Sequence, residues 1–213
     1  MIINKDTAEN VAQILLQIKA VKLSPTKPFT WASGWKSPIY CDNRVSLSYP
    51  QTRTFLRQQF SAQILEHFGK PDVIAGVATG AIAIGALVAE ELGLPFVYVR
   101  SAAKEHGLGN LVEGFATKGQ SVVVIEDLIS TGGSSLKAVE ALREYGCIVK
   151  GMAAIFTYGF EKSEKAFKDA KCNLITLSDY PTLIKKAFDQ SFVNAKEIEQ
   201  LKEWRKKPDT WEK

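Results

Sequence analysis

From residue 73 onward, short apolar runs alternate with segments whose apolar residues recur at helical spacing. Residues 73–77, 96–99, 121–125, 148–156 and 174–177 predict strands, and residues 82–92, 134–145 and 161–170 predict the helices between them. Strands that are apolar on both faces and are separated by helices are typical of a parallel sheet covered on both sides. The pattern therefore predicts an α/β fold, with further helices after residue 177.

The first 72 residues follow a different pattern. A helix capped by Asn4 or Asp6 is expected to bury one face, formed by Val11, Ile14, Leu15 and Ile18. A second helix is expected from Tyr49-Pro50 to about residue 68, with an inward face formed by Phe55, Leu56, Phe60, Ile64 and Leu65. The stretch between them, KLSPTKPFTWASGWKSPIYCDNR, predicts loops and short strands, and the polar, aperiodic residues 101–114 predict a long loop.

Composition adds limits to this picture. The 213 residues suit one domain, and the net charge of +4 is mild. Three separated cysteines predict a reducing compartment, and two distant histidines do not suggest a zinc site. The chain opens without a secretory signal and its longest apolar run is broken by glycines, so we expect a cytoplasmic protein without a membrane segment. We interpret one basic cluster as the solvated end of a helix rather than a nucleic-acid surface: Lys202, Arg205, Lys206 and Lys207.

The segment with the clearest chemistry is EDLISTGGSS, residues 126–135, which follows a predicted buried strand. Its small residues let a ligand approach the backbone, and Gly132 and Gly133 allow unusual dihedral angles. Backbone N–H groups at the helix start near Ser134 predict an anion site. Two adjacent carboxylates would repel a phosphate unless they face hydroxyl groups or a metal ion, and a phosphorylated ribose satisfies both halves. A capped turn with two solvated acids is the structural alternative.

Two further segments fall at the same edge of the predicted sheet, where open α/β sheets bind ligands. GVATGAIAIG, residues 76–85, offers N–H groups at another helix start, although tight packing of strand on helix would need the same residues. RSAAKEHGLGN, residues 100–110, places Arg100, Lys104 and His106 on a glycine-containing loop, which is typical of a lid or a binding loop. The chain contains neither a P-loop nor a GxGxxG motif, so the usual nucleotide loops are not supported.

Three segments together resemble a known family. VVVIEDLISTGG, residues 122–133, resembles the phosphoribosyl pyrophosphate (PRPP) signature of type I phosphoribosyltransferases. FTWASGWKSPIYCDNR, residues 29–44, resembles the N-terminal hood of orotate phosphoribosyltransferases, and residues 100–110 are similar to the catalytic loop of that family. The resemblance implies a parallel-sheet type I phosphoribosyltransferase core with helices on both faces and a small N-terminal hood, about residues 1–45, in a single domain 1–213.

The resemblance also implies an activity. The phosphoribosyl group of PRPP would be transferred to orotate, giving orotidine 5′-monophosphate and pyrophosphate in pyrimidine (UMP) biosynthesis. Mg²⁺ would be the cofactor, held mainly through PRPP and not directly by the protein. Members of the family are homodimers in which the catalytic loop acts on the site of the neighbouring subunit.

The same resemblance assigns residues to roles. The catalytic residues would be Lys104, His106, Arg100 and Asp127. PRPP would be bound by Arg100, Lys104, His106, Glu126, Asp127, Leu128, Ile129, Ser130, Thr131, Gly132, Gly133, Ser134, Ala78, Thr79 and Gly80. Orotate would be bound by Ser130, Phe29 and Lys36.

This chain departs from part of the family's pattern. Some members carry lysine where it has Ala32 and Ser101, and Tyr-Lys-Gly where it has Ala78-Thr79-Gly80. The partner of the orotate carboxylate is left open between Lys36 and backbone N–H groups. Two other functions also stay open: a purine-base phosphoribosyltransferase, and a regulator that binds PRPP without catalysis, although no nucleic-acid-binding element accompanies the chain.

Overall fold

The computed structural model describes residues 4–31, 33–101 and 111–211. The helices are α1 (Lys5–Gln17), α2 (Pro50–Phe68), α3 (Ile82–Leu92), α4 (Gly133–Glu144), α5 (Glu161–Asp169), α6 (Tyr180–Asp189) and α7 (Ala195–Lys206), with a 3-10 helix η1 (Asn43–Ser48). The strands are β1 (Val21–Leu23), β2 (Phe29–Thr30), β3 (Lys36–Ser37), β4 (Ile39–Cys41), β5 (Val73–Val77), β6 (Phe96–Val99), β7 (Val112–Glu113), β8 (Ser121–Ile129), β9 (Ile148–Thr157) and β10 (Leu174–Asp179).

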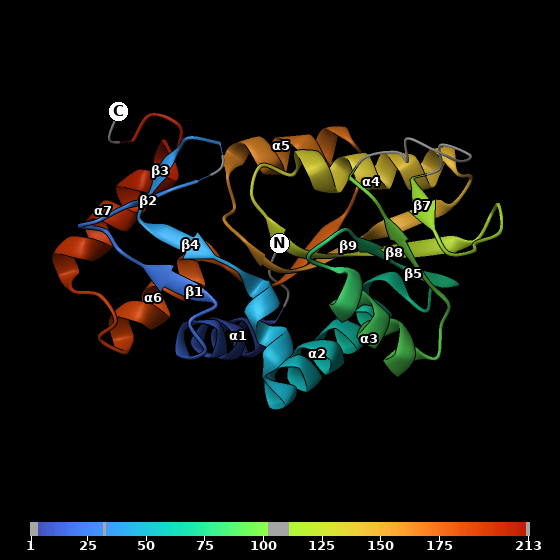
Figure 1. The fold of residues 1–213 in the computed structure, drawn as a ribbon, viewed down its shortest axis with the longest axis horizontal. Helices are drawn as coiled ribbons and strands as arrows, with labels where there is room; N and C mark the ends of the chain where they lie inside the picture. Colours follow the sequence, from blue (N-terminus) through green and yellow to red (C-terminus); the bar gives the residue numbers. More distant parts are fainter. Residues whose placement is uncertain (1–3, 32, 102–110, 212–213) are drawn as a thin grey trace.

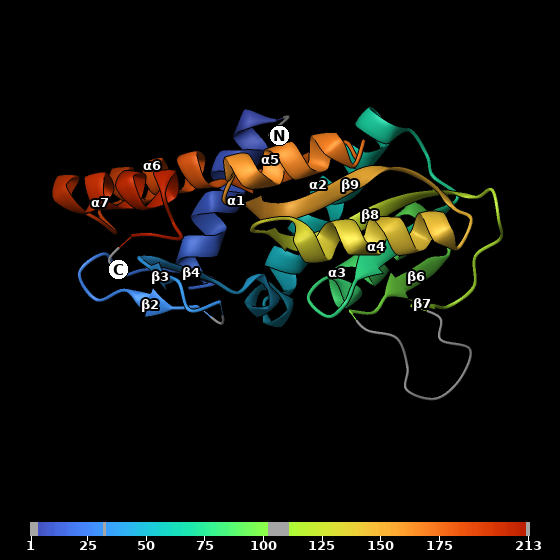
Figure 2. The same ribbon diagram turned by 90° about the horizontal axis from the view of Figure 1, so that it is seen from above.

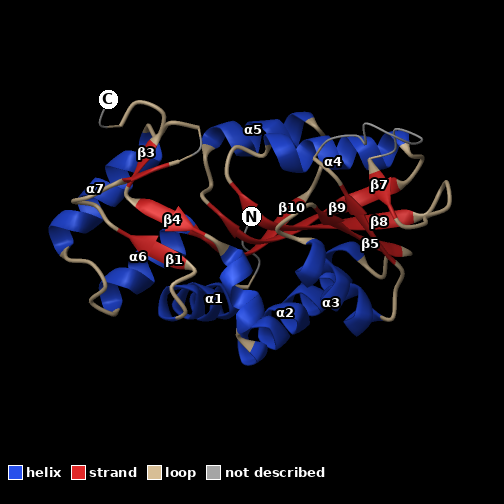
Figure 3. Ribbon diagram, viewed as in Figure 1, coloured by secondary structure: helices blue, strands red, loops and turns tan. Residues whose placement is uncertain are grey.

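Six strands form the central sheet in the order β10-β9-β8-β5-β6-β7. All neighbours are parallel except β7, which pairs antiparallel with β6 at one edge. Helices α4 and α5 cover one face of the sheet, and α1, α2 and α3 cover the other (Figures 1 and 3). This confirms the predicted α/β architecture and follows from right-handed crossovers between parallel strands.

The sheet is buried on both faces because its strands carry apolar side chains at successive positions. Along β5 and β8, Val73, Val122 and Val124 pack in one core cluster with Val139 and Leu142 of α4. The intervening side chains, Ile74, Val123 and Ile125, pack in a second cluster with Leu56 and Phe60 of α2 and Ile84 of α3. The unbroken apolar runs of the sequence are thus explained by helices on both sides.

The segment before α2 forms two small antiparallel pairs beside this core. β1 pairs with β4, and β2 pairs with β3 to make a hairpin, which we call the hood hairpin (residues 29–37). These strands lie on the same side of the molecule as α6 and α7 (Figures 1 and 2). Helix α1, capped by the side chain of Asn4, instead packs against β10 and α6.

Three predictions of local structure were wrong. β8 does not end at residue 125 but continues to Ile129, so Glu126 and Asp127 lie within the strand. Residues 112–113, expected in a loop, form β7, whose two residues are too few to show a period. Leu65 is 45% exposed rather than inward, because it lies about 100° around α2 from the buried Ile64. Among the described residues, no helix is long and apolar enough to span a bilayer.

Candidate active site

The loops that follow β5 and β8 meet at the carboxyl edge of the sheet. The two strands are neighbours, with Gly76 paired to Ile125, so their next residues enter the same space. A pocket of about 430 Å³ opens there. Its lining comes from three segments: Cys41, Asp42 and Arg44, then Val77, Ala78, Thr79 and Gly80, and then Glu126, Asp127, Leu128 and Ser134. The segments after β5 and β8, which the sequence predicted to lie at one edge of the sheet, therefore line this pocket together with residues 41–44.

Gly80 allows the 78–80 loop to lie directly against the Asp127 side chain. A Cβ at position 80 would collide with the carboxylate of Asp127, so no other residue fits without movement. The loop is also tied to the sheet, because Ala78 N donates to Val99 O at 2.8 Å and Ala81 N donates to Val77 O at 3.0 Å. The Ala78–Thr79 peptide is cis. One wall of the pocket is thus backbone, and the opposite wall carries a carboxylate.

The two acids of the pocket differ in environment. Glu126 is only 5% exposed, and its two oxygens accept hydrogen bonds from Asp127 N at 3.0 Å and from Ser135 Oγ at 2.8 Å. Burial, followed by the negative charge of Asp127, raises the pKa of Glu126 to about 8. Asp127 is partly exposed and its side chain borders Gly80. Asp127 is therefore the acid with the freer carboxylate for a ligand, while Glu126 is already bonded within the protein.

The 130–134 loop leads into the N-terminus of α4. Gly132 caps the helix with φ at +82°, a left-handed conformation that favours glycine. A Cβ there would lie 2.9 Å from Cε2 of the Phe167 ring, so packing also requires glycine. The first N–H groups of a helix have no acceptors within it, and the helix dipole places positive charge at this end. The loop therefore forms a site for an anion such as a phosphate.

The third wall of the pocket, residues 41–44, was missed by the sequence reasoning. Asn43 Nδ2 donates to Asp127 O at 2.6 Å, which holds the segment on β8. Arg44 donates to both carboxylate oxygens of Asp42, at 2.7 and 2.8 Å. The Asp42 carboxyl keeps a lowered pKa, chiefly because of its hydrogen bond from Arg44. The signal for this wall was the polar run Asp-Asn-Arg at the end of the segment 29–44 that resembles the hood.

Three further predicted residues, Arg100, Phe29 and Lys36, are not among the residues that line this pocket. Arg100 directly follows β6, and its Nη1 lies 3.5 Å from Glu113 Oε1. In the hood hairpin, Lys36 Nζ donates to Thr30 Oγ1 at 2.9 Å, and the Phe29 ring packs against Tyr40 with centroids 5.7 Å apart. Lys104 and His106 lie outside the described residues.

A second, larger cavity of about 1110 Å³ lies between α5, α6 and α7. Thr131 of the 130–134 loop lines it, together with Trp35 of the hood hairpin and Gly159 of the loop after β9. The 130–134 loop therefore separates two hollows, one beside the acids and one beside the C-terminal helices.

The metal prediction concerns Mg²⁺ carried by the substrate. Among the residues described, no three His, Cys, Asp or Glu side chains cluster closely enough to hold a metal ion. The pocket nevertheless presents carboxyl oxygens from Asp42, Glu126 and Asp127, and oxygen is the type of ligand atom that Mg²⁺ prefers.

Known proteins share both the sequence and the fold. Residues 53–187 match the family model described as phosphoribosyl transferase domain. The chain is 61% identical over 201 residues to orotate phosphoribosyltransferase of Phocaeicola vulgatus, covering 94% of this chain and 95% of that protein. It is 56% identical over 207 residues to that of Porphyromonas gingivalis, covering 97% and 99%. The solved orotate phosphoribosyltransferase of Aeropyrum pernix superposes with a TM-score of 0.72 at 26% identity, covering 86% and 99%. The chain therefore belongs to the orotate phosphoribosyltransferase family.

Proposed function

We propose that the protein transfers the phosphoribosyl group of PRPP to orotate, giving orotidine 5′-monophosphate and pyrophosphate in the biosynthesis of UMP. The observation that carries this proposal is the pocket at the ends of β5 and β8. It combines the N-terminus of α4, a backbone wall at Gly80 and the carboxylate of Asp127. These three features match the phosphate, the pyrophosphate and the vicinal hydroxyls of one ligand.

Each part of PRPP has a counterpart in the pocket. The 5′-phosphate would accept hydrogen bonds from the backbone N–H groups of the 130–134 loop and the first turn of α4. The ribose hydroxyls would donate to Asp127, with Glu126 behind it. The pyrophosphate would lie along the 78–80 loop, within reach of Arg100. Orotate would then approach C1 of the ribose from the side of the hood hairpin, near Ser130, Phe29 and Lys36.

The reaction breaks the bond from C1 to pyrophosphate and forms a bond from C1 to a ring nitrogen of orotate. The proton of that nitrogen passes to the released pyrophosphate or to solvent. Positive charge grows on the ribose ring and negative charge grows on the leaving group. Groups placed in advance where these charges develop lower the barrier more than groups that reorganise during the step. Asp127 would lie on the side of the ribose ring, and Arg100 with Lys104 and His106 would serve the pyrophosphate.

Arg44 adds a cation that the family pattern did not lead us to expect. The 78–80 loop of this chain lacks the lysine that some family members carry there, and Arg44 lines the same pocket. Its guanidinium is bonded to Asp42 and its side chain is 56% exposed. We propose that it contributes to the attraction of the polyanionic substrate, while Mg²⁺, held mainly through PRPP, supplies further charge neutralisation when bound.

We also propose that the protein is a cytoplasmic homodimer in which Lys104 and His106 act on the neighbouring subunit's site. The family to which the chain belongs supports this arrangement. Mixing Lys104→Ala with a second inactive variant, Asp127→Asn, tests it, because mixed dimers would regain one complete site. Activity restored on mixing supports action in trans, and no restoration in confirmed mixed dimers contradicts it.

The function itself is tested by incubating the purified protein with orotate, PRPP and Mg²⁺ and following the loss of orotate absorbance and the release of pyrophosphate. The expected result is stoichiometric formation of orotidine 5′-monophosphate and pyrophosphate. Parallel reactions with adenine, guanine, hypoxanthine and xanthine serve as controls. Faster consumption of a purine would replace the proposal with a purine-base transferase, and PRPP binding without turnover of any base would replace it with a regulator.

A further inference from the structure

Two consecutive side chains near the end of α7 bond to two segments far apart in sequence. Trp204 Nε1 donates to Lys36 O of the hood hairpin at 3.1 Å. Arg205 donates from Nε to Tyr158 O at 3.0 Å and from Nη2 to Gly159 O at 2.9 Å. The sequence prediction that Arg205 is a solvated charge was therefore wrong, because its guanidinium is held on two backbone carbonyls. Helix α7 thus joins the hood hairpin to the loop that follows β9.

The loop after β9 is bonded on its other side to the strand that carries the acids. Tyr158 N donates to Ile129 O, the last residue of β8, at 3.1 Å. Gly159 has φ at +61°, and a Cβ there would lie 2.9 Å from Arg205 Nη2. The loop is therefore fixed between β8 and Arg205, and a side chain at position 159 would displace the Arg205 guanidinium.

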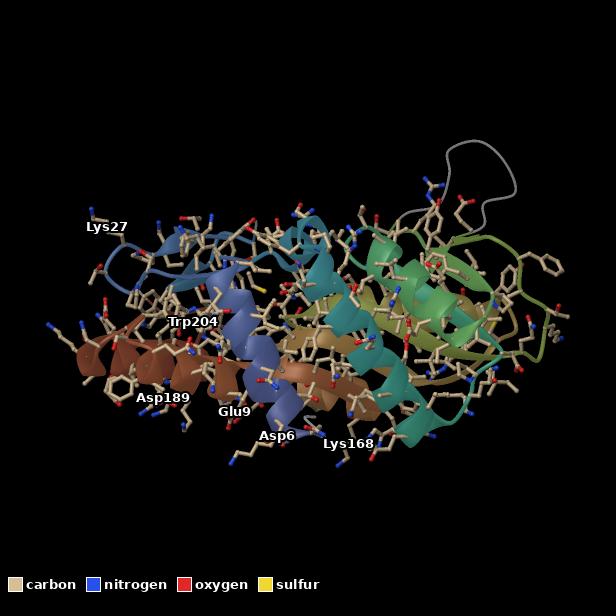
Figure 4. All side chains as sticks on the ribbon, turned by 90° about the horizontal axis from the view of Figure 1, so that it is seen from below. Asp6, Glu9, Lys27, Lys168, Asp189 and Trp204 are labelled. Carbon is tan, nitrogen blue, oxygen red and sulfur yellow. The ribbon has the colours of Figure 1, made fainter. Side chains whose placement is uncertain are left out.

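Trp204 extends this connection through packed aromatic rings. It is fully buried, and its ring lies edge-on to those of Trp31, Tyr158 and Phe160, each with centroids 5.6 Å apart. Trp31 belongs to the hood hairpin, and its Nε1 donates to Ile39 O at 3.1 Å. Figure 4 shows Trp204 on the side of α7 that faces the hood. Because packed rings transmit small displacements, the position of the hairpin depends on this side chain.

The hood hairpin and α7 both lie outside the shared family domain. The match to the phosphoribosyl transferase domain spans residues 53–187, which leaves out the hood hairpin before it and α7 after it. The PRPP pocket is lined mainly by residues within that range. The two outlying parts contact each other, and α7 also bonds to the loop that follows β9. The proposed function places the base on the side of the hood hairpin.

We propose that Arg205 and Trp204 are positioning residues that hold the hood hairpin and the loop after β9 around the base, and that they set the affinity for the base rather than for PRPP. The inference rests on the proposed function, because it takes the ligand beneath the hood to be orotate. Arginine suits this role because its planar fork donates to two neighbouring carbonyls at once, whereas a lysine ammonium donates as a point.

The test compares Arg205→Ala, Arg205→Lys and Trp204→Phe with Lys206→Ala. Lys206 is an exposed cation on the same turn, and no ion pair is found for it among the described residues, so it controls for the loss of charge. We measure KM for orotate and KM for PRPP separately, well below the thermal unfolding midpoint of each variant. Trp204→Phe keeps a ring in the cluster but removes the donor to Lys36 O.

Arg205→Ala is expected to raise KM for orotate about tenfold, equivalent to about 1.4 kcal/mol, with KM for PRPP changed less than about twofold. Arg205→Lys and Trp204→Phe are expected to show smaller rises in the same constant, and Lys206→Ala none. Equal rises in both constants, or an Arg205→Ala variant that matches Lys206→Ala, would overturn the inference. If Arg205→Ala does not fold, the other two variants decide it. If the wild-type protein used another base, the change in KM for that base, compared with the change in KM for PRPP, would still test the positioning role. Failure of the proposed function can therefore be distinguished from failure of this inference.

Discussion

Replacing Glu126 with glutamine is expected to remove a pH dependence of stability from the free protein. In the folded state the pKa of this carboxyl is raised from 4.5 to about 8, first by burial and then by the charge of Asp127. Glutamine keeps the shape, since its oxygen accepts from Asp127 N while its amide group donates to Ser135 Oγ. The variant therefore removes the buried charge without leaving the two neighbours unpaired.

The sign follows from proton binding. Between pH 4.5 and 8 the unfolded protein has released the Glu126 proton and the folded protein has kept it, so the unfolded state binds fewer protons. The contribution of Glu126 to the free energy of unfolding is therefore largest below pH 4.5, falls as the pH rises toward 8, and is constant above pH 8. One pKa unit corresponds to about 1.4 kcal/mol, so the wild-type free energy of unfolding should fall by about 3 kcal/mol relative to the variant between pH 5.5 and 8.5.

The assay is urea unfolding followed by tryptophan fluorescence at three pH values across this range, with wild type and Glu126→Gln measured side by side. Because all other titrating groups are shared, the difference between the two proteins isolates position 126. The free energy of unfolding of the variant should increase relative to that of wild type as the pH rises. If the free energies of unfolding of the two proteins change in parallel with pH across the range, the fold does not raise the pKa of Glu126. That result would refute the electrostatic description of the acidic pair.

Three further predictions concern two walls of the pocket and the predicted catalytic loop. Gly80→Ala should weaken PRPP binding by tenfold or more by isothermal titration, because the new Cβ displaces the Asp127 carboxylate; unchanged affinity would mean that ligand does not occupy this wall. Asn43→Ala should lower the free energy of unfolding by about 1–3 kcal/mol, since the Asp127 carbonyl loses its donor; a loss below 0.5 kcal/mol in urea titrations would contradict the bond. Lys104→Ala should lower kcat by about ten- to a thousand-fold with an unchanged unfolding midpoint, and full activity would remove the loop from the reaction.

The core of the fold could be predicted because its strands and helices are locally consistent. Strands β5 and β6 and helix α3 begin and end where the apolar pattern changes. The end of β8 could not be found in this way, since two acids normally terminate an apolar strand. Glu126 continues the strand, paired with Ala154 of β9, and its buried side chain accepts a hydrogen bond from Ser135, nine residues away. A hydrogen bond that depends on the tertiary fold leaves no trace in local periodicity.

The part of the candidate site that is formed by the loops after β5 and β8 could also be predicted from the sequence. Loops that follow neighbouring parallel strands meet at one edge of a sheet, so the approach of Gly80 to Asp127 follows from strand order. The contribution of residues 41–44 depends on how the hood lies on the core, which a single sequence does not encode in any spacing. Arg205 shows the same limit, because only the packing of α7 distinguishes it from the solvated lysines around it.

The central claim is that PRPP binds where the ends of β5 and β8 meet the N-terminus of α4, and a crystal structure of the complex with PRPP and Mg²⁺ tests it most directly. The account predicts the 5′-phosphate on the N–H groups of residues 131–134, the ribose hydroxyls against Asp127, and the pyrophosphate beside Gly80. Density for the ligand in the cavity between α5, α6 and α7, with the 130–134 loop unbound, would contradict it.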